Sequence, residues 1–239
     1  MLGMKDVFRF KEFSVDQSGC AMRINTDGVL LGAYAHLPSK HVRVLDIGTG
    51  TGVIALMLAQ RFPNAVIDGV EIDLKAASIA TENFKASRFS NRLEVFNSSF
   101  QDLQEGGAYD WVVSNPPYHL HSLKNHDERK SQARHSDILF FQELFQKAAR
   151  LLGDHGCLQL VLPSIISASL EEIAKKEGFF RQEVLWIRSF DESPVIRKIV
   201  KWGKQQVDDI KEEEFIIYES KGQYSRQYKE LLAPFFLAF

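Results

Sequence analysis

A glycine-rich segment in the first quarter of the chain has the residue types of a nucleotide-binding loop. Three glycines at alternate positions, Gly48, Gly50 and Gly52, follow Asp46 and a run of branched apolar residues. Glycine lets a backbone approach a ligand without a Cβ clash and readily adopts positive φ angles. At the start of a helix, such a loop also points N–H groups at the ligand. We expect it to bind a cofactor, because a simple tight turn needs only one glycine.

Two classes of cofactor fit these glycines. The run Gly50-x-Gly52-x-x-Ala55 satisfies the dinucleotide fingerprint, and Glu71 lies where that fingerprint places its ribose-binding acid. Asp46 favours S-adenosylmethionine (AdoMet), because a carboxylate at a strand end would repel a diphosphate but suits the ammonium or the bound waters of AdoMet's amino-acid end. Glu71 would then accept hydrogen bonds from both ribose hydroxyls, and we assign Ile72 beside it to the same site.

A second motif, Asn115-Pro116-Pro117-Tyr118, has the residue types needed to hold a planar amine. The amine of adenine is a poor nucleophile, because its lone pair is delocalised into the ring. The Asn115 side-chain oxygen and the Pro116 carbonyl would accept hydrogen bonds from its N–H groups and stabilise the charge that develops during attack. The prolines fix this geometry, and Tyr118 offers a ring on which a flipped base can stack. The alternative is a rigid turn without chemistry.

The elements around these motifs predict an α/β fold. From about residue 41 the chain alternates β-branched runs with helical patterns, which is typical of a parallel sheet covered by helices. Both motifs would then lie at the carboxyl edge of the sheet. We expect strands at 42–47, 65–71, 92–97, 110–114, 157–162, 183–189, 195–202 and 215–219, and helices at 53–61, 74–87, 137–152 and 170–177. Residues 1–40 are expected to form an arm or lid over the cofactor ahead of the domain 41–239, and residues 204–214 a solvated loop.

Composition limits the classes of function. With 239 residues, 45% of them apolar, the chain can bury the core of one domain. Its 29 basic and 31 acidic residues give a net charge of −2, which excludes a purely electrostatic nucleic-acid binder. Two distant cysteines, Cys20 and Cys157, do not form a disulfide framework or a metal motif, and we expect no metal site despite several histidines after Tyr118. Without an apolar span or a signal peptide, we expect a cytoplasmic monomer.

Two groups of basic residues are candidates for holding RNA. A flipped base needs its flanking phosphates held, and at this net charge only local positive potential can do so. The first group follows the acceptor motif and comprises Lys124, Arg129, Lys130 and Arg134. The second lies in the closing strands and the loop after them and comprises Arg188, Arg197, Lys198, Lys201 and Lys204, of which we assign Arg197 and Lys198 to RNA. Ordinary solvated charge is the alternative for both groups.

Over nearly its whole length, the chain resembles class I methyltransferases of the Asn-Pro-Pro-Tyr type. More closely, it resembles the bacterial enzymes that methylate N6 of the adenine beside the anticodon (adenine 37) of valine tRNA. The resemblance rests on Asp46 to Gly52, on Asn115 to Tyr118, and on the segment from Asn25 to Tyr34. It implies a Rossmann-like, mostly parallel seven-stranded sheet with helices on both faces and an antiparallel final strand. It also implies that Thr26, Asp27 and Gly28 lie over the cofactor. Taken alone, these three residues could be merely the cap of an apolar helix.

One position departs from the family pattern. Many relatives carry an Asp after the third strand, where it binds the adenine amine of the cofactor. This chain has Asn97-Ser98-Ser99-Phe100 there, and we expect either Ser99 or a backbone carbonyl to make the contact.

Three other functions compete with this interpretation. Enzymes that methylate a glutamine of release factors also carry Asn-Pro-Pro-Tyr, but they have a separate helical substrate domain for which 40 residues are too few. Enzymes that methylate N2 of guanine in ribosomal RNA more often have Phe after the prolines. A module that only binds AdoMet would have no use for an intact acceptor motif.

Overall fold

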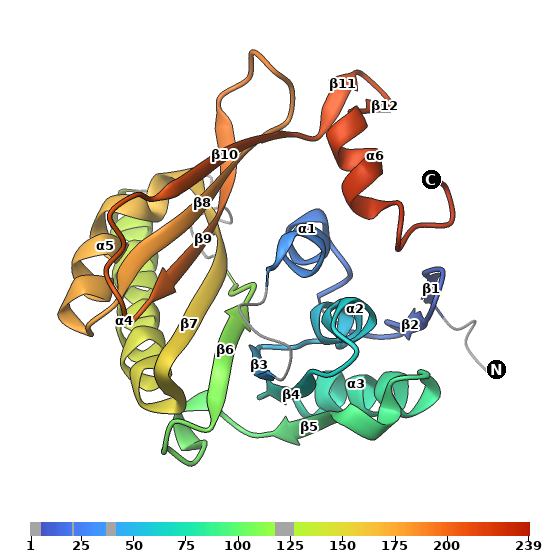
Figure 1. Ribbon diagram of the computed structural model, residues 1–239, viewed down its shortest axis with the longest axis horizontal. Coiled ribbons are helices and arrows are strands. Elements are labelled where there is room, and N and C mark those ends of the chain that lie inside the picture. The colour runs from blue at the N-terminus through green and yellow to red at the C-terminus, as the bar shows by residue number, and fades with distance from the viewer. Residues whose placement is uncertain (1–5, 21, 37–41, 118–126) are drawn as a thin grey trace.

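An eight-stranded sheet forms the centre of the molecule (Figure 1). The computed structural model describes residues 6–20, 22–36, 42–117 and 127–239, of which 127–135 and 167–169 are described in their backbone only. The strand order is β10-β8-β9-β7-β6-β3-β4-β5, and β9 is antiparallel to both of its neighbours, whereas the other pairs are parallel. The strands are β3 (Arg43–Ile47), β4 (Val66–Glu71), β5 (Leu93–Asn97), β6 (Tyr109–Ser114), β7 (Leu152–Pro163), β8 (Phe180–Arg188), β9 (Val195–Gly203) and β10 (Lys211–Ile216).

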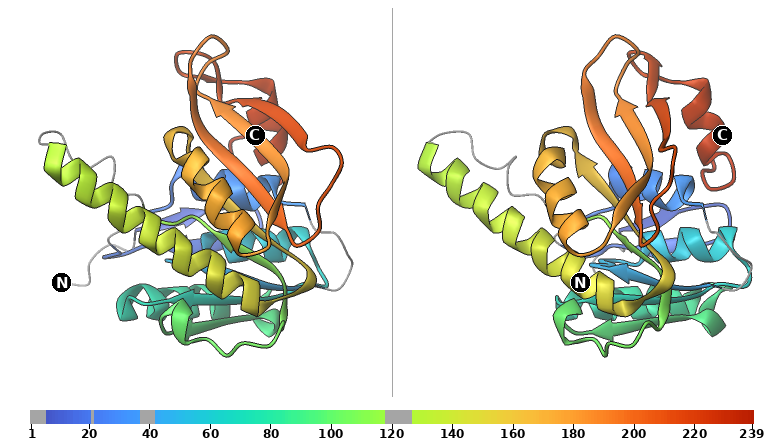
Figure 2. Two further views of the ribbon diagram at one scale, coloured as in Figure 1. Left: turned by 90° about the vertical axis from the view of Figure 1, so that its left-hand side faces the viewer. Right: turned by 60° about the vertical axis from the view of Figure 1, so that its left-hand side comes forward.

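Helices cover both faces of the sheet, each over its own apolar core. In Figure 1, α1 (Thr26–Tyr34), α2 (Val53–Arg61) and α3 (Leu74–Ala86) lie to the right of the sheet, and α4 (Asp127–Leu151) and α5 (Ser167–Lys176) lie to its left. Residues 53–59 of α2 are all buried, which explains why this helix is apolar on every side. The amino-terminal part of α4 projects beyond the sheet (Figure 2).

The remaining elements are short. The hairpin of β1 (Val7–Arg9) and β2 (Ser14–Asp16) is joined to the α3 side through Asn83, whose side chain accepts from the Asp16 amide and donates to the Asp16 carbonyl at 2.9 Å each. A second pair, β11 (Tyr218–Ser220) and β12 (Gln223–Tyr224), precedes α6 (Arg226–Leu232). Within the described residues, no helix is long and apolar enough to cross a membrane.

The pairing of β3 with β6 brings the two predicted motifs together. Ile47, the last residue of β3, lies opposite Ser114, the last residue of β6. The Ser114 hydroxyl donates a buried hydrogen bond of 2.7 Å to the Ile47 carbonyl and fixes this register. On the other side of β3, Ile47 pairs with Val70 of β4. Gly48, Glu71 and Asn115 therefore leave neighbouring strands at the same edge.

The α/β class and the mostly parallel sheet are confirmed, and two details are wrong. The helix predicted from residue 137 begins at Asp127. β10 begins at Lys211, inside the segment predicted as a solvated loop, and includes the first two residues of the strand expected at 215–219. The sheet therefore has eight strands, whereas the resemblance implies seven. Charged side chains are tolerated here because β10 is an edge strand. Its carboxylates can pair with cations of the neighbouring strand, as Glu214 does with Arg188 of β8.

Candidate active site

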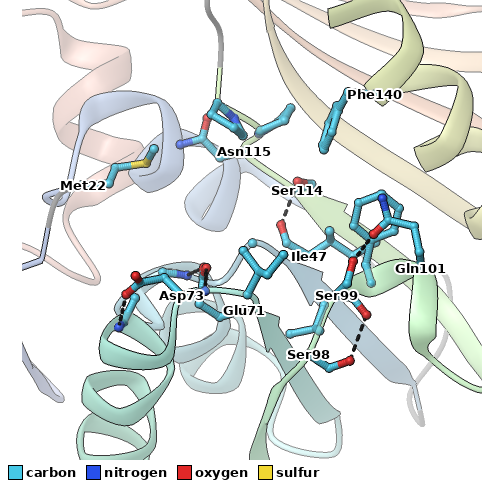
Figure 3. A pocket seen from close by; sticks show the side chains of 18 of the residues that line it. Met22, Ile47, Glu71, Asp73, Ser98, Ser99, Gln101, Ser114, Asn115 and Phe140 are labelled. Carbon is cyan, nitrogen blue, oxygen red and sulfur yellow. Dashed lines mark hydrogen bonds between the residues drawn. The ribbon is translucent and has the colours of Figure 1, made fainter. Parts of the chain in front are cut away.

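A cleft of about 450 Å³ lies at the carboxyl ends of β3, β4, β5 and β6 (Figure 3). Its walls come from elements far apart in the sequence, and its size is that of a small-molecule site. Asn115 and Phe140 lie on one side of it, and Glu71, Asp73 and Ser98 lie on the other. The side chains and backbone that line it belong to Cys20, Met22, Ile47, Gly48, Gly50, Val70, Glu71, Ile72, Asp73, Ala76, Ser98, Ser99, Phe100, Gln101, Ser114, Asn115, Pro116, Pro117 and Phe140.

The predicted glycines have two different functions. Gly48 and Gly50 line the cleft with φ angles of 69° and 58°, and no other atom lies within 4 Å of the position that a Cβ would take at either residue. That open space lets a ligand approach the backbone closely. Gly52 does not line the cleft. A Cβ there would lie 2.4 Å from the Phe84 ring, so this glycine is required for packing at the start of α2.

Asp46 lies behind the glycine loop and does not line the cleft. It is fully buried, and its Oδ2 accepts a hydrogen bond of 2.7 Å from the Thr49 hydroxyl. No donor in the described residues reaches its Oδ1. Burial raises the pKa of this carboxyl to about 7, although the bond from Thr49 opposes the shift. A buried acceptor without a donor fits a bound water or an ammonium at the inner end of the cleft.

Glu71 supports the loop and faces the cleft. Its Oε2 accepts from the Gly50 amide and its Oε1 from the Asp73 amide, both at 2.9 Å. Each carboxylate oxygen keeps a free lone-pair direction, so both can still accept the two hydroxyls of a ribose. Ile72 beside it is 74% exposed and offers an apolar surface that a bound adenosine would cover.

The segment after β5 forms the wall farther from the glycine loop. Ser98, Ser99, Phe100 and Gln101 line the cleft there. The Ser99 hydroxyl donates to the Gln101 side-chain oxygen, and the Gln101 Nε2 donates to Glu143 of α4 at 2.8 Å. A hydroxyl that donates in this way keeps its lone pairs free, which is consistent with Ser99 as an acceptor for the cofactor's amine.

The acceptor motif lies on the side of the cleft opposite Glu71. Asn115 is half-buried, Pro116 is buried and Pro117 is exposed, and all three line the cleft. The Asn115 Nδ2 donates a hydrogen bond of 3.2 Å to the Asn25 side-chain oxygen. No donor among the described residues reaches its Oδ1, which can accept a hydrogen bond from a substrate. Tyr118 lies outside the described residues.

The residues predicted to cover the cofactor form the first turn of α1 and do not line the cleft. Asn25 caps this helix by accepting the Gly28 amide at 2.9 Å. Asp27 forms an ion pair of 2.7 Å with Arg197 on β9. Thr26 and Gly28 belong to the same turn. Arg197, which we assigned to RNA, is thus engaged in holding α1 on the sheet.

The rest of the second basic group also has intramolecular partners. Lys198 is only 6% exposed and lies over the Trp186 ring, 4.6 Å from its centroid, where burial lowers the pKa of its ammonium. Lys201 pairs with Glu183 at 3.3 Å. The other members bind backbone carbonyls: Arg188 that of Ser193, and Lys204 those of Ala149 and Leu152. In the first group, Lys124 and the side chains of Arg129, Lys130 and Arg134 lie outside the described part of the chain.

Eleven cleft residues were not predicted: Cys20, Met22, Ile47, Val70, Asp73, Ala76, Ser98, Phe100, Gln101, Ser114 and Phe140. Cys20 and Met22 come from the loop before α1, Gln101 follows β5, and Phe140 lies on α4. Their residue types give no signal of a ligand in the sequence. Only the fold places them beside the glycine loop.

No metal site is evident where side chains are described, since no group there contains three or more suitably placed His, Cys, Asp or Glu residues. His119, His121 and His126 fall outside this part of the chain, as does the side chain of His135.

Comparisons with known proteins agree with this geometry. Residues 28–179 match the family model described as "Methyltransferase small domain". A tRNA1(Val) (adenine(37)-N6)-methyltransferase of Pedobacter heparinus is 48% identical over 238 residues, which cover 99% of this chain and 100% of that protein. A protein of the same name from Bacteroides fragilis is 40% identical over 96% of this chain and 97% of its own length. The chain belongs to this methyltransferase family. It is an AdoMet-dependent enzyme.

Solved structures support the fold of the methyltransferase. A predicted O-methyltransferase from Agrobacterium tumefaciens superimposes with a TM-score of 0.69 over 87% of this chain and 96% of its own. The sequence identity of the pair is 18%, so this likeness concerns the architecture alone.

The open space at Gly50 predicts a specific defect in AdoMet binding. Gly50→Ala adds a methyl group in the cleft and forces alanine into the left-handed region, whereas Gly222→Ala imposes the same strain (φ 80°) in open space at the turn between β11 and β12. Both variants should lose about 1–2 kcal/mol of stability. Calorimetry should show AdoMet affinity reduced about tenfold or more only in Gly50→Ala. Equal affinities in the two variants would contradict the assignment.

The raised pKa of Asp46 predicts a pH-dependent contribution to stability. The folded protein holds this proton up to about pH 7, whereas an unfolded chain releases it near the ordinary aspartate pKa of 3.8. The stabilisation is therefore fully present below the unfolded pKa and is lost as the pH rises to the folded pKa. Asp46→Asn has no such proton to lose. Its Tm relative to the parent should increase from about pH 4 to pH 8, and a constant difference would contradict the shift.

Proposed function

We propose that this methyltransferase transfers the methyl group of AdoMet to the N6 amine of adenine 37 in valine tRNA. The observation that carries the proposal is the position of Asn115, which lines the same cleft as the glycine loop and whose side-chain oxygen accepts no hydrogen bond from the described residues. The relatives from Pedobacter heparinus and Bacteroides fragilis, both named for this reaction, match over nearly the full chain and support the choice of substrate.

Different residues of the cleft would bind the cofactor and the acceptor amine. The Gly48 and Gly50 backbone and the Glu71 carboxylate would hold the cofactor, with Ser99 at its adenine and Asp46 behind its amino-acid end. AdoMet supplies an electrophilic methyl group. The protein therefore needs to align the amine with that methyl more than it needs a strong base.

Asn115 and Pro116 would bind the acceptor amine. The Asn115 Oδ1 and the Pro116 carbonyl accept one hydrogen bond each from its two N–H groups. These bonds favour a pyramidal nitrogen and stabilise the positive charge that develops there. The proton leaves after the new N–C bond has formed. Tyr118 remains our choice for stacking on the flipped base.

The N-terminal segment would close the cofactor side. Cys20 and Met22 line the cleft, and the Gln17 side-chain oxygen accepts the Ile24 amide at 3.0 Å and so shapes the loop that carries them. We infer that this loop is the part of the predicted arm that covers AdoMet. The following helix, α1, has seven buried residues, five of which belong to the apolar core, and it anchors this loop.

The amino-terminal end of α4 is our candidate for binding tRNA. Arg129, Lys130 and Arg134 lie in the first turns of this helix, which follows the acceptor motif in the chain. The amino-terminal part of the helix projects beyond the sheet (Figure 2). The closing-strand cations are engaged elsewhere, so this group is the one left from the two candidates. Positive charge there would hold the phosphates that flank the flipped base.

Replacing Asn115 tests the proposed reaction. Asn115→Ala should lower methyl transfer to a valine tRNA transcript by about a hundredfold or more, because an oxyanion-type contact is lost, while AdoMet affinity measured by calorimetry stays within a few-fold. Mass spectrometry of nucleosides from the parent reaction should show N6-methyladenine. An unmethylated tRNA, or methyl on guanine or protein, would contradict the proposed function.

Charge removal on α4 tests the tRNA-binding surface. Arg129→Ala with Lys130→Ala should raise the KM for tRNA and flatten its salt dependence, with AdoMet binding unchanged. Lys175→Ala with Lys176→Ala removes the same charge from exposed residues at the end of α5 and is the matched control. If both double variants kept the parent's KM and salt slope, α4 would not be the tRNA contact.

A further inference from the structure

One side-chain oxygen joins the capped end of α1 to the acceptor motif. The Asn25 Oδ1 accepts the Gly28 amide at 2.9 Å, which caps the helix, and also the Asn115 Nδ2 at 3.2 Å. A carbonyl oxygen has two lone pairs, so these donors saturate it. The residue that starts α1 is thus in direct contact with the residue that faces the substrate.

The helix cap decides which way the Asn115 amide is turned. An asparagine amide has a donor end and an acceptor end of nearly the same shape, and its orientation is set by its hydrogen-bond partners. The Asn25 oxygen must face the Gly28 amide to cap α1, so it presents only an acceptor to Asn115. Asn115 satisfies it with its nitrogen, and its oxygen is thereby directed away from α1.

We propose that Asn25 is a positioning residue that keeps the oxygen of Asn115, and not its nitrogen, toward the acceptor amine. This inference rests on the proposed function, because the orientation of the Asn115 amide matters only for a substrate that donates hydrogen bonds from N–H groups. If the Asn115 amide turned over, its NH2 group would face the amine, donor against donor. The acceptor would be lost, and the developing positive charge would be opposed.

The surroundings of Asn25 hold it rigidly enough for this purpose. The ion pair between Asp27 and Arg197 ties the first turn of α1 to β9, with both side chains about three-quarters buried. Seven residues of α1, Gly28 to Tyr34, are buried against the core. Gly28 packs beside the contact, since a Cβ there would lie 3.5 Å from both the Asn115 Nδ2 and the Asn25 Oδ1.

Two substitutions separate capping from positioning. Asn25→Ser keeps a good helix cap, but its shorter side chain cannot also reach Asn115. Asn25→Asp keeps an acceptor for both donors. We expect Asn25→Ser to reduce kcat for tRNA methylation about tenfold or more, with the Tm and the AdoMet affinity near those of the parent. Asn25→Asp should retain kcat within a few-fold.

A double-substitution cycle makes the test independent of folding. In an Asn115→Ala background, Asn25→Ser should lower the residual rate no further, because the group that it orients is gone. The proposal is overturned if Asn25→Ser keeps the parent's kcat, if Asn25→Asp falls as far as Asn25→Ser, or if Asn25→Ser costs the same in both backgrounds. An inactive parent would instead overturn the proposed function.

Discussion

The parallel pairing of β3 with β6 is the constraint on which the site depends. Methyl transfer requires the donor and the acceptor to be held in line, and the two loops that hold them leave adjacent strands at the same level. The buried bond from the Ser114 hydroxyl to the Ile47 carbonyl fixes that level. A shift by one residue would turn Ile47 and Ser114 to the opposite faces of the sheet and separate Gly48 from Asn115. The Asn25 contact adds rotational control to this positional control, since it sets which end of an amide faces the substrate.

Several cations of this protein hold the chain together. Arg197 joins α1 to the sheet, Lys204 binds the carbonyls at the end of α4, and Arg43 pairs with the buried Asp68 at 2.8 Å. These cations cannot also bind phosphates without releasing their partners. Since the net charge is −2, binding of the proposed tRNA substrate would therefore need local positive charge near the acceptor motif, where the flanking phosphates of a flipped base would lie.

The sequence predicts the parts of the site whose residue types are dictated by chemistry. Glycines in a left-handed loop, an acid at the end of β4 and an Asn-Pro-Pro turn after β6 each have a local reason to be where they are, and the cleft contains them. It does not predict Gln101 or Phe140, which face the cleft only because α4 meets the segment after β5 there. Asp27 and Arg197 were assigned to different ligands, but they bind each other. The sequence gives no sign of this pair, because the two residues are 170 positions apart and only the fold brings β9 to α1. The sequence also does not predict the start of β10, because this strand begins in a charged segment and an edge strand needs few apolar residues.

The most direct measurement of the central claim is a crystal structure of the protein with S-adenosylhomocysteine and a valine tRNA anticodon stem-loop. We predict that the N6 amine of adenine 37 lies within about 2.6–3.2 Å of the Asn115 Oδ1 and of the Pro116 carbonyl, in line with the cofactor's sulfur. The Asn115 Nδ2 should still donate to Asn25. An adenine bound outside the cleft, or an Asn115 whose nitrogen faces the base, would contradict the account.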